Sequence, residues 1–191
     1  LIASSLTLVH SVTAQTNNAV AGQPAVPEIT SSTTTNKQHT LDVPPGREGA
    51  RMAQKYYLAG KYQEAADIYL EALKGASDEA QQDFRFNAAV SLFKAEKYRE
   101  AADILKDLFQ KGKSGQTEYS KALGAALFRA ADIPKDADCS KISDRARLLN
   151  ESGEAFKEAV RSAPENNQSR RNLAVVLDKL PAAQEQAKTP E

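Results

Sequence analysis

A near-duplication of eight residues constrains this chain more than any other feature. Lys61 to Ile68 reads Lys-Tyr-Gln-Glu-Ala-Ala-Asp-Ile, and Lys97 to Ile104 repeats it 36 residues later with seven of the eight positions identical. Self-similarity at a fixed period of this size is the sequence mark of stacked-repeat architectures. One repeated helical unit cannot bury its apolar face alone, so units stack and form an extended surface suited to holding a partner. The duplication therefore favours a binding protein over an enzyme.

Composition narrows the classes of ligand. The chain has 191 residues with equal numbers of basic and acidic side chains, 25 of each, so no global field draws it to nucleic acid or an anionic membrane. A single cysteine, Cys139, excludes an internal disulfide framework and a cysteine-based zinc site. Both histidines, His10 and His39, precede the repeat region, which leaves no Ser/His/Asp or Cys/His group there. We expect no enzymatic activity, no cofactor, no metal and no nucleic-acid partner.

The first fourteen residues differ from the rest of the chain. Leu1 to Ala14 is apolar, carries no Lys, Arg, Asp or Glu, and ends in Val12-Thr13-Ala14. An apolar stretch followed by a small-x-small pattern is typical of the end of a secretory signal peptide, with cleavage here after Ala14. The stretch is too short to span a bilayer unaided. We interpret 1–14 as a signal peptide remnant; the alternative is an apolar tail without a role.

The remaining chain divides by composition. Residues 15–45 form a Ser/Thr/Pro-rich segment without helical periodicity, which predicts a disordered linker. In residues 46–180, apolar side chains recur at intervals of three and four, so the pattern is helical throughout. Residues 181–191 read as a disordered tail that begins at Pro181.

Aligned copies of the duplicated segment reveal a recurring spacing of small and large residues. Upstream of the two copies come Met52-Ala53-x2-Tyr56 and Ala88-Ala89-x2-Leu92, and the same quartet recurs as Leu123-Gly124-x2-Leu127 and Leu173-Ala174-x2-Leu177. The second helices carry Ala65-x3-Tyr69-x2-Ala72, Ala101-x3-Leu105-x2-Leu108 and Ser152-x3-Phe156-x2-Ala159, with Pro164 closing the third. This spacing resembles the tetratricopeptide repeat, which runs Leu-Gly-x2-Tyr, then Ala-x3-Phe/Tyr, then Pro, over about 34 residues. The small residues let the two helices of one unit approach closely.

The resemblance implies an all-α fold, a right-handed solenoid of antiparallel helix pairs with a concave groove lined by the first helix of each pair. The expected units are about 46–81, 82–116 and 117–166, the last with an insertion near 133–148, followed by a capping helix at 167–180. The insertion predicts a loop near Ile133 to Lys141 and extra N-terminal turns on the third unit's second helix. Ser143, followed by Asp144, is the expected N-cap of that helix.

The same resemblance suggests where a partner would bind. Members of the family contact ligands with the groove side of their first helices. The matching positions here are Tyr57, Phe86, Asn87, Val90, Phe93, Lys94, Lys121, Phe128, Arg129, Arg171 and Asn172. Amides beside aromatic rings and cations suit an extended peptide, held by its backbone and acidic side chains. The alternative is that the aromatic rings pack between neighbouring repeats and the cations are solvated.

These observations lead to one functional expectation and one rival. The expected function is a non-catalytic scaffold that binds a peptide or helix of another protein in the groove. The signal-like start and the family's use in bacterial envelope assemblies place it in an envelope complex, exported to the periplasm of a Gram-negative type bacterium. The rival is a structural repeat protein that self-associates through an exposed terminal face while its groove stays unused.

Overall fold

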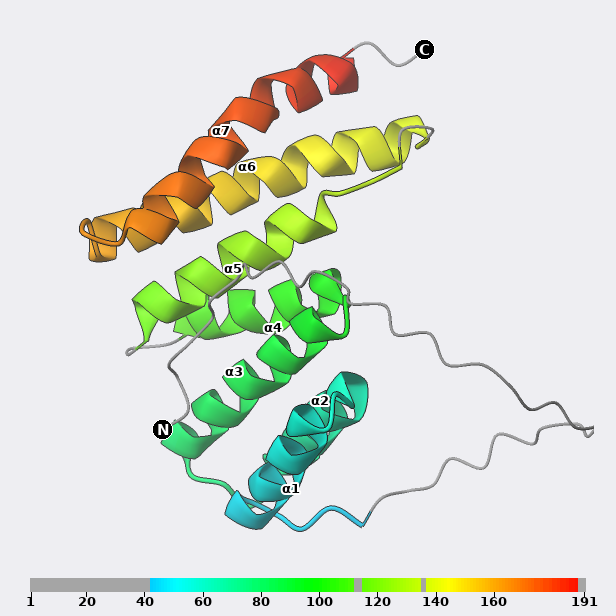
Figure 1. The fold of residues 1–191 in the computed structure, drawn as a ribbon, viewed down its shortest axis with the longest axis vertical. Helices are drawn as coiled ribbons and strands as arrows, with labels where there is room; N and C mark the ends of the chain where they lie inside the picture. Colours follow the sequence, from blue (N-terminus) through cyan, green and yellow to red (C-terminus); the bar gives the residue numbers. More distant parts are fainter. Residues whose placement is uncertain (1–41, 112–114, 135–136, 189–191) are drawn as a thin grey trace, which may run out of the picture. The chain divides into compact units, whose positions relative to one another are not determined.

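A computed structural model describes residues 42–111, 115–134 and 137–188. Within these ranges the chain forms helices without strands (Figure 1), which confirms the predicted all-α class. In chain order the helices are α1 (Arg47–Leu58), α2 (Tyr62–Glu71), α3 (Asp78–Lys94), α4 (Tyr98–Lys111), α5 (Gln116–Ala130), α6 (Cys139–Ser162) and α7 (Asn167–Lys188). The expected signal remnant and nearly all of the expected linker lie outside the described residues.

Each helix packs chiefly against the next one in the chain, from α1 on α2 through to α6 on α7. Alternate helices touch more lightly, α3 with α5 and α5 with α7. The two duplicated segments begin α2 and α4, so the copies occupy equivalent places in successive helix pairs. This order of packing follows from short connections, because helices joined by a few residues become antiparallel neighbours.

Small side chains mark the closest contacts between helices. Ala53, Ala65, Ala89 and Ala101 are fully inaccessible to solvent. All nine residues of the spacing predicted for the second helices are buried: Ala65, Tyr69, Ala72, Ala101, Leu105, Leu108, Ser152, Phe156 and Ala159. Large residues therefore fill the space that the small ones leave between the helices.

The approach of α5 to α6 is especially close at Gly124. A Cβ atom at this position would lie 2.9 Å from three ring carbons of Phe156. The Ser152 hydroxyl, 0% exposed, donates a hydrogen bond of 2.7 Å to the Gly124 carbonyl oxygen. Only a residue without a side chain lets the buried Phe156 ring rest against the α5 backbone.

Helix α6 begins earlier than the sequence led us to expect. Its N-cap is Asp138, whose carboxylate accepts a 2.9 Å hydrogen bond from the Lys141 amide, so Ser143 is not the cap. Asp144 instead pairs with Arg99 of α4 and with Arg147 one turn further along α6. The expected N-terminal extension of this helix is present, since α6 runs for 24 residues.

Helix α7 also extends further than predicted. We expected the helix to end at Leu180 and a disordered tail to start at Pro181, but α7 continues through Pro181 to Lys188. Its buried residues, Ser169, Val176 and Ala183, recur every seven positions and form a stripe. Past the proline, Ala183 is 0% exposed and the Arg145 guanidinium of α6 donates a 2.9 Å hydrogen bond to the Gln186 side chain. This tertiary packing outweighs the loss of one backbone hydrogen bond at Pro181.

Candidate functional site

Two of the predicted groove aromatics pack on a tyrosine within their own helix pair. Tyr57 meets Tyr62 at a centroid distance of 5.2 Å and an interplanar angle of 65°. Phe93 meets Tyr98 36 residues later, at 5.2 Å and 68°. Edge-to-face contact of this kind holds the turn between the two helices of each pair. Burial raises the pKa of Tyr57, and the neighbouring Tyr62 adds to the rise. The Tyr57 and Phe93 rings are both half-buried, and their contacts stabilise the turn between the two helices of their pair.

The other predicted apolar positions are also half-buried. The Phe86 ring of α3 lies 5.4 Å from the Tyr119 ring of α5, a contact between the first helices of neighbouring pairs. Phe128 packs against a cluster of buried residues that includes Leu92, Leu105 and Leu127. Val90 is half-buried on α3. The expectation that aromatics pack between repeats thus describes Phe86, whereas Tyr57 and Phe93 pack within one pair.

The two predicted amides have different surroundings. Asn172 accepts a 2.8 Å hydrogen bond at its side-chain oxygen from Gln168, one turn earlier on α7. Asn87 is half-buried on α3, and its backbone carbonyl accepts a 2.7 Å hydrogen bond from Ser91. Asn87 thus lies on the first helix of a pair and Asn172 on α7, at the capping position, and among the described residues only the Asn172 side chain makes a hydrogen bond.

The four predicted cations differ in how they are held. Lys121 forms an ion pair with Glu118 at 2.9 Å, and Arg171 donates from Nε to the Asn167 carbonyl at 3.3 Å. Lys94 is exposed at the last turn of α3, and within the described ranges it forms no ion pair. Exposed ion pairs are worth little to stability, so these side chains are free to exchange partners.

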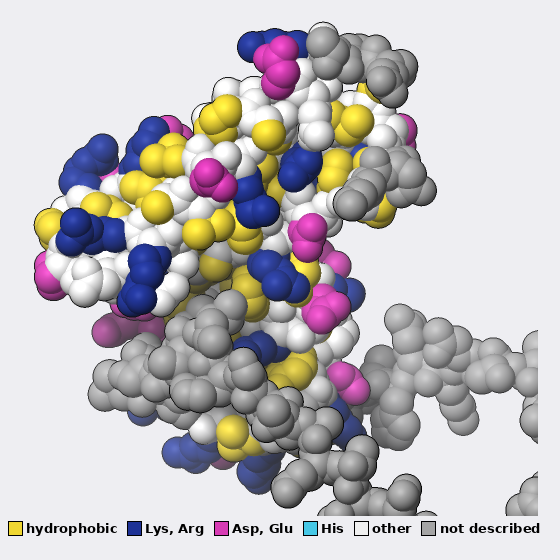
Figure 2. Space-filling view, turned by 45° about the horizontal axis from the view of Figure 1, so that its top comes forward, with side chains coloured by type: hydrophobic (Ala, Val, Ile, Leu, Met, Phe, Trp, Pro, Cys, Tyr) yellow, Lys and Arg dark blue, Asp and Glu magenta, His cyan; other side chains and the backbone are white. Residues whose placement is uncertain are grey.

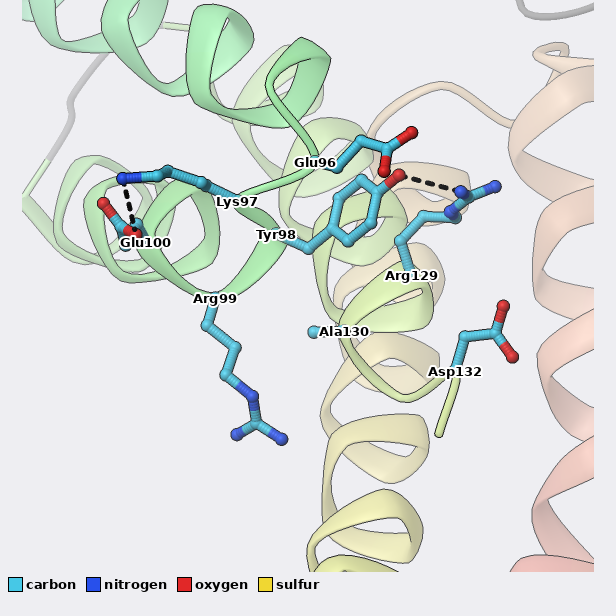
Figure 3. A pocket seen from close by; sticks show the side chains of 8 residues that line it. All are labelled: Glu96, Lys97, Tyr98, Arg99, Glu100, Arg129, Ala130 and Asp132. Carbon is cyan, nitrogen blue, oxygen red and sulfur yellow. Dashed lines mark hydrogen bonds and ion pairs between the residues drawn. The ribbon is translucent and has the colours of Figure 1, made fainter. Parts of the chain in front are cut away.

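Arg129 is fixed more firmly than the other cations. Its guanidinium carbon lies 4.9 Å from the centroid of the Tyr98 ring, and Nη2 donates a 2.8 Å hydrogen bond to the Tyr98 hydroxyl oxygen. Figure 3 shows the two side chains pointing toward one another, one from the start of α4 and the other from the end of α5. A cation over an aromatic face is attracted by the ring quadrupole. The contact therefore ties neighbouring helix pairs together.

A hollow of about 510 Å³ opens beside this contact. Its walls come from the α3–α4 turn, the first turn of α4 and the end of α5 (Figure 3): Glu96, Lys97, Tyr98, Arg99, Glu100, Arg129, Ala130 and Asp132. Three acidic and three basic side chains line it, with Lys97 and Glu100 paired at 3.4 Å. Such a balanced lining can hydrogen-bond a peptide but does not select one sign of charge.

Arg129 is the one member of the predicted set that lines this hollow. The sequence missed the others because they lie in the α3–α4 turn, the first turn of α4 and the end of α5, and their closeness to one another depends on how the helix pairs stack. A signal was present nonetheless. Tyr62 and Tyr98 are identical positions in the duplicated segments, each five residues after a predicted groove aromatic.

A chain of charges also links the second helices of neighbouring pairs. Asp144 of α6 lies between Arg99 of α4, at 2.5 Å, and Arg147 of its own helix. Burial raises the pKa of Asp144, but hydrogen bonds from Arg147 and Arg99 outweigh it, so the pKa lies below its ordinary value. Glu151 continues the chain, accepting from Arg147 at 2.6 Å and from Lys106 of α4 at 3.2 Å. These ion pairs link the side chains of α6 to those of α4.

Among the residues that the structure describes, no three His, Cys, Asp or Glu side chains are grouped so as to hold a metal ion. A search of the same residues for a helix long and apolar enough to cross a membrane finds none. Neither comparison, one with protein-family models and one with curated proteins, gives a match for this chain. The functional argument therefore rests on the residues and contacts above.

Proposed function

We propose that this chain is a non-catalytic protein-interaction scaffold of the tetratricopeptide type. The observation that carries the proposal is the placement of the recurring small residues. Ala53 and Ala89 on first helices, like Ala65 and Ala101 on second helices, are fully buried where consecutive helices pack. That is the place the tetratricopeptide spacing assigns to them. An array built in this way devotes its buried residues to stacking and leaves its surfaces for partners.

In this proposal α1–α2, α3–α4 and α5–α6 are three helix pairs of a right-handed solenoid, and α7 caps the last pair. The first helices line a concave groove. The light contact of α3 with α5 supports this, because it brings two first helices side by side, and the capping helix α7 touches α5 in the same way. The Phe86–Tyr119 contact supports it too, since it joins α3 and α5 at the level of the groove positions.

The partner in this proposal is a peptide or helix that carries acidic side chains. Lys94 is exposed and forms no ion pair within the described ranges, and Arg171 is exposed as well. Lys94 lies on α3, a first helix near the middle of the array, and Arg171 lies on the capping helix α7 at its end. Exposed cations of this kind attract acidic segments and give charge-assisted hydrogen bonds.

The place of action in this proposal is the periplasm, within an envelope assembly. Its support is the sequence of Leu1 to Ala14 alone, which lies outside the described residues. The test is N-terminal sequencing of the natively exported protein, which should begin at Gln15. Retention of residues 1–14 in the mature protein would remove the argument for export.

The groove is tested by charge reversal. The full chain, produced with its own leader, is used to capture partners from an envelope extract with and without Lys94→Glu and Arg129→Glu together. We expect the double variant to lose the main captured protein while helicity stays unchanged. The matched control reverses Lys74 and Lys157, which lie in the turn after α2 and on α6 and form local ion pairs with Glu71 and Glu154. Loss of the partner in the control, with capture intact in the groove variant, would place the site on the second helices.

A further inference from the structure

Helix α7 exposes apolar side chains on the face turned away from α6. Ala174, Leu177 and Pro181 share one side of the helix; Ala174 and Pro181 are exposed and Leu177 is 45% exposed. Val175, 47% exposed, lies on the other flank of the helix. Figure 2 shows apolar side chains at the surface over α6 and α7, interspersed with Lys and Arg. The buried stripe at Ser169, Val176 and Ala183 lies on the side of the helix opposite Ala174 and Pro181, and Leu177 lies at the edge of the exposed side, about 100° from Val176.

The exposed face is built like a face that elsewhere holds a helix. In the recurring spacing, Ala174 and Leu177 match Ala89 and Leu92 of α3. Those two residues are 0% and 3% exposed, in the helix that packs directly against α4. A small residue followed three positions later by leucine is thus covered in α3 and uncovered in α7. In α3, Ala89 and Leu92 are covered by the antiparallel helix α4, so a helix of the same orientation would cover Ala174 and Leu177.

A basic residue accompanies this face in both helices. Arg85 lies four positions before Ala89 and forms a 3.4 Å ion pair with Asp107 near the end of α4. Arg170 lies four positions before Ala174 and is exposed. A helix covering α7 in the same way would present an acidic residue near its own C-terminal end, opposite Arg170.

We propose that the cover is α7 of a second copy of this chain, antiparallel to the first about a two-fold axis between Leu177 and Asp178. Residues 170, 174, 177, 181 and 185 share one face of the helix. Antiparallel pairing about that axis places Arg170 opposite Glu185 of the second copy, and Ala174 opposite Pro181. The two-fold axis makes each contact twice.

The charges select both the partner and its direction. One helix carries both halves of the ion pair, Arg170 near its start and Glu185 near its end, so the face is complementary to itself. Parallel pairing would instead bring Arg170 to Arg170 and Glu185 to Glu185. Glu185 has Lys188 at 3.7 Å, an exposed pair that can rearrange. Ala174 and Pro181 are small enough for the axes to approach at the short end of the usual 8–10 Å.

The expected association is weak and reversible. The apolar stripe is narrow, and interfaces near the lower size limit of about 1,000–1,200 Å² are transient. The inference concerns α7 alone and does not depend on the groove proposed above, so either can fail without the other. Both can also operate together, because α7 would join two arrays while their first helices stay open.

The test is sedimentation velocity of the full chain over a concentration series around the micromolar range. We expect a monomer–dimer equilibrium. Arg170→Glu alone and Glu185→Arg alone should each weaken dimerisation by roughly tenfold, because two attractions become repulsions. The two changes together should restore it. Leu177→Ser should also weaken the dimer, whereas Leu58→Ser on α1, at a residue 76% exposed, should not.

Cross-linking decides the direction. In a Cys139→Ser background, Leu177→Cys should yield a dimer with a short thiol-reactive cross-linker. Arg170→Cys should not, because fifteen helical positions separate the two copies of residue 170 along the axis, about 22 Å. A monomer at every concentration would overturn the proposal. So would a dimer that is indifferent to the changes on α7, or one in which the double charge swap fails to restore association.

Discussion

The contact between Gly124 and Phe156 gives the sharpest test of how the helices pair. Replacing Gly124 by alanine places a methyl group 2.9 Å from three carbons of the Phe156 ring, which is 2% exposed and has no free side to move toward. Overpacking of this kind costs about 1–3 kcal/mol. Alanine also improves helix propensity by about 1 kcal/mol. The net expectation is a loss of about 0–2 kcal/mol in the free energy of unfolding.

Gly153, on the side of α6 that faces α7, supplies a matched control. It is also buried within a helix, but a Cβ there would meet the Val176 methyl group at an ordinary 3.6 Å. Gly153→Ala should therefore raise the free energy of unfolding by most of the difference in helix propensity between glycine and alanine, about 1 kcal/mol. Since both variants share that term, the gap of about 1–3 kcal/mol between them isolates the contact with Phe156.

The assay is urea denaturation followed by circular dichroism at 222 nm, with thermal melting as a second readout. At about 2–4 °C per kcal/mol, the two variants should differ clearly in melting temperature. A Phe156→Leu background should reduce the cost of Gly124→Ala, because the two sites share one contact and their effects are not additive. If Gly124→Ala proves as stable as Gly153→Ala, the close approach of α5 and α6 is wrong.

Two further predictions concern polar contacts between helices. Ser152→Ala removes the buried hydrogen bond to the Gly124 carbonyl and should cost about 1–2 kcal/mol in urea denaturation. Ser120→Ala, whose hydroxyl bonds only to Thr117 within its own helix, should cost less; equal losses would argue against the inter-helix bond. Asp144 has a pKa lowered by Arg147 and Arg99 against the effect of burial, so its share of stability is complete above the ordinary aspartate value near pH 4 and is lost as pH falls through the lowered pKa. Asp144→Asn should lower stability at pH 7 by about 1 kcal/mol or less, and a deficit that fails to shrink in acid would contradict the ion-pair assignment.

The helix order and the buried small residues were predictable because they follow from local sterics. A helix needs apolar residues every three or four positions, and two helices in close contact need small side chains where they meet. Ala65 and Ala101, each opening a second helix, were identified from the duplicated segment alone and are fully buried. Such features depend on residues close in the sequence, which repeat with the unit.

The helix ends were less predictable because several residues could serve equally well. Asp138 and Ser143 are both good N-caps, and the choice of Asp138 leaves Asp144 in α6 where it meets Arg99 of another helix. Pro181 is a helix breaker by local propensity, yet the buried Ala183 and the bond from Arg145 to Gln186 keep α7 helical beyond it. Contacts between distant segments decided both ends.

The candidate site was predictable only as a set of positions. The sequence identified Tyr57, Phe93 and Phe128 as aromatic groove positions but not what the rings contact. In the structure, the Tyr57 ring packs on Tyr62 and the Phe93 ring packs on Tyr98. The Arg129 guanidinium lies over the Tyr98 ring. These contacts depend on the angle between helices, which a linear pattern does not specify.

Site-specific photo-cross-linking in living cells tests the central claim most directly. A photoreactive phenylalanine analogue is introduced in the full chain at Lys94 on α3 or, as the control, at Lys157 on α6. The proposed groove predicts a discrete adduct with another protein from position 94 and none from position 157. Adducts from position 157 alone would contradict the account, because they would place the partner on the second helices.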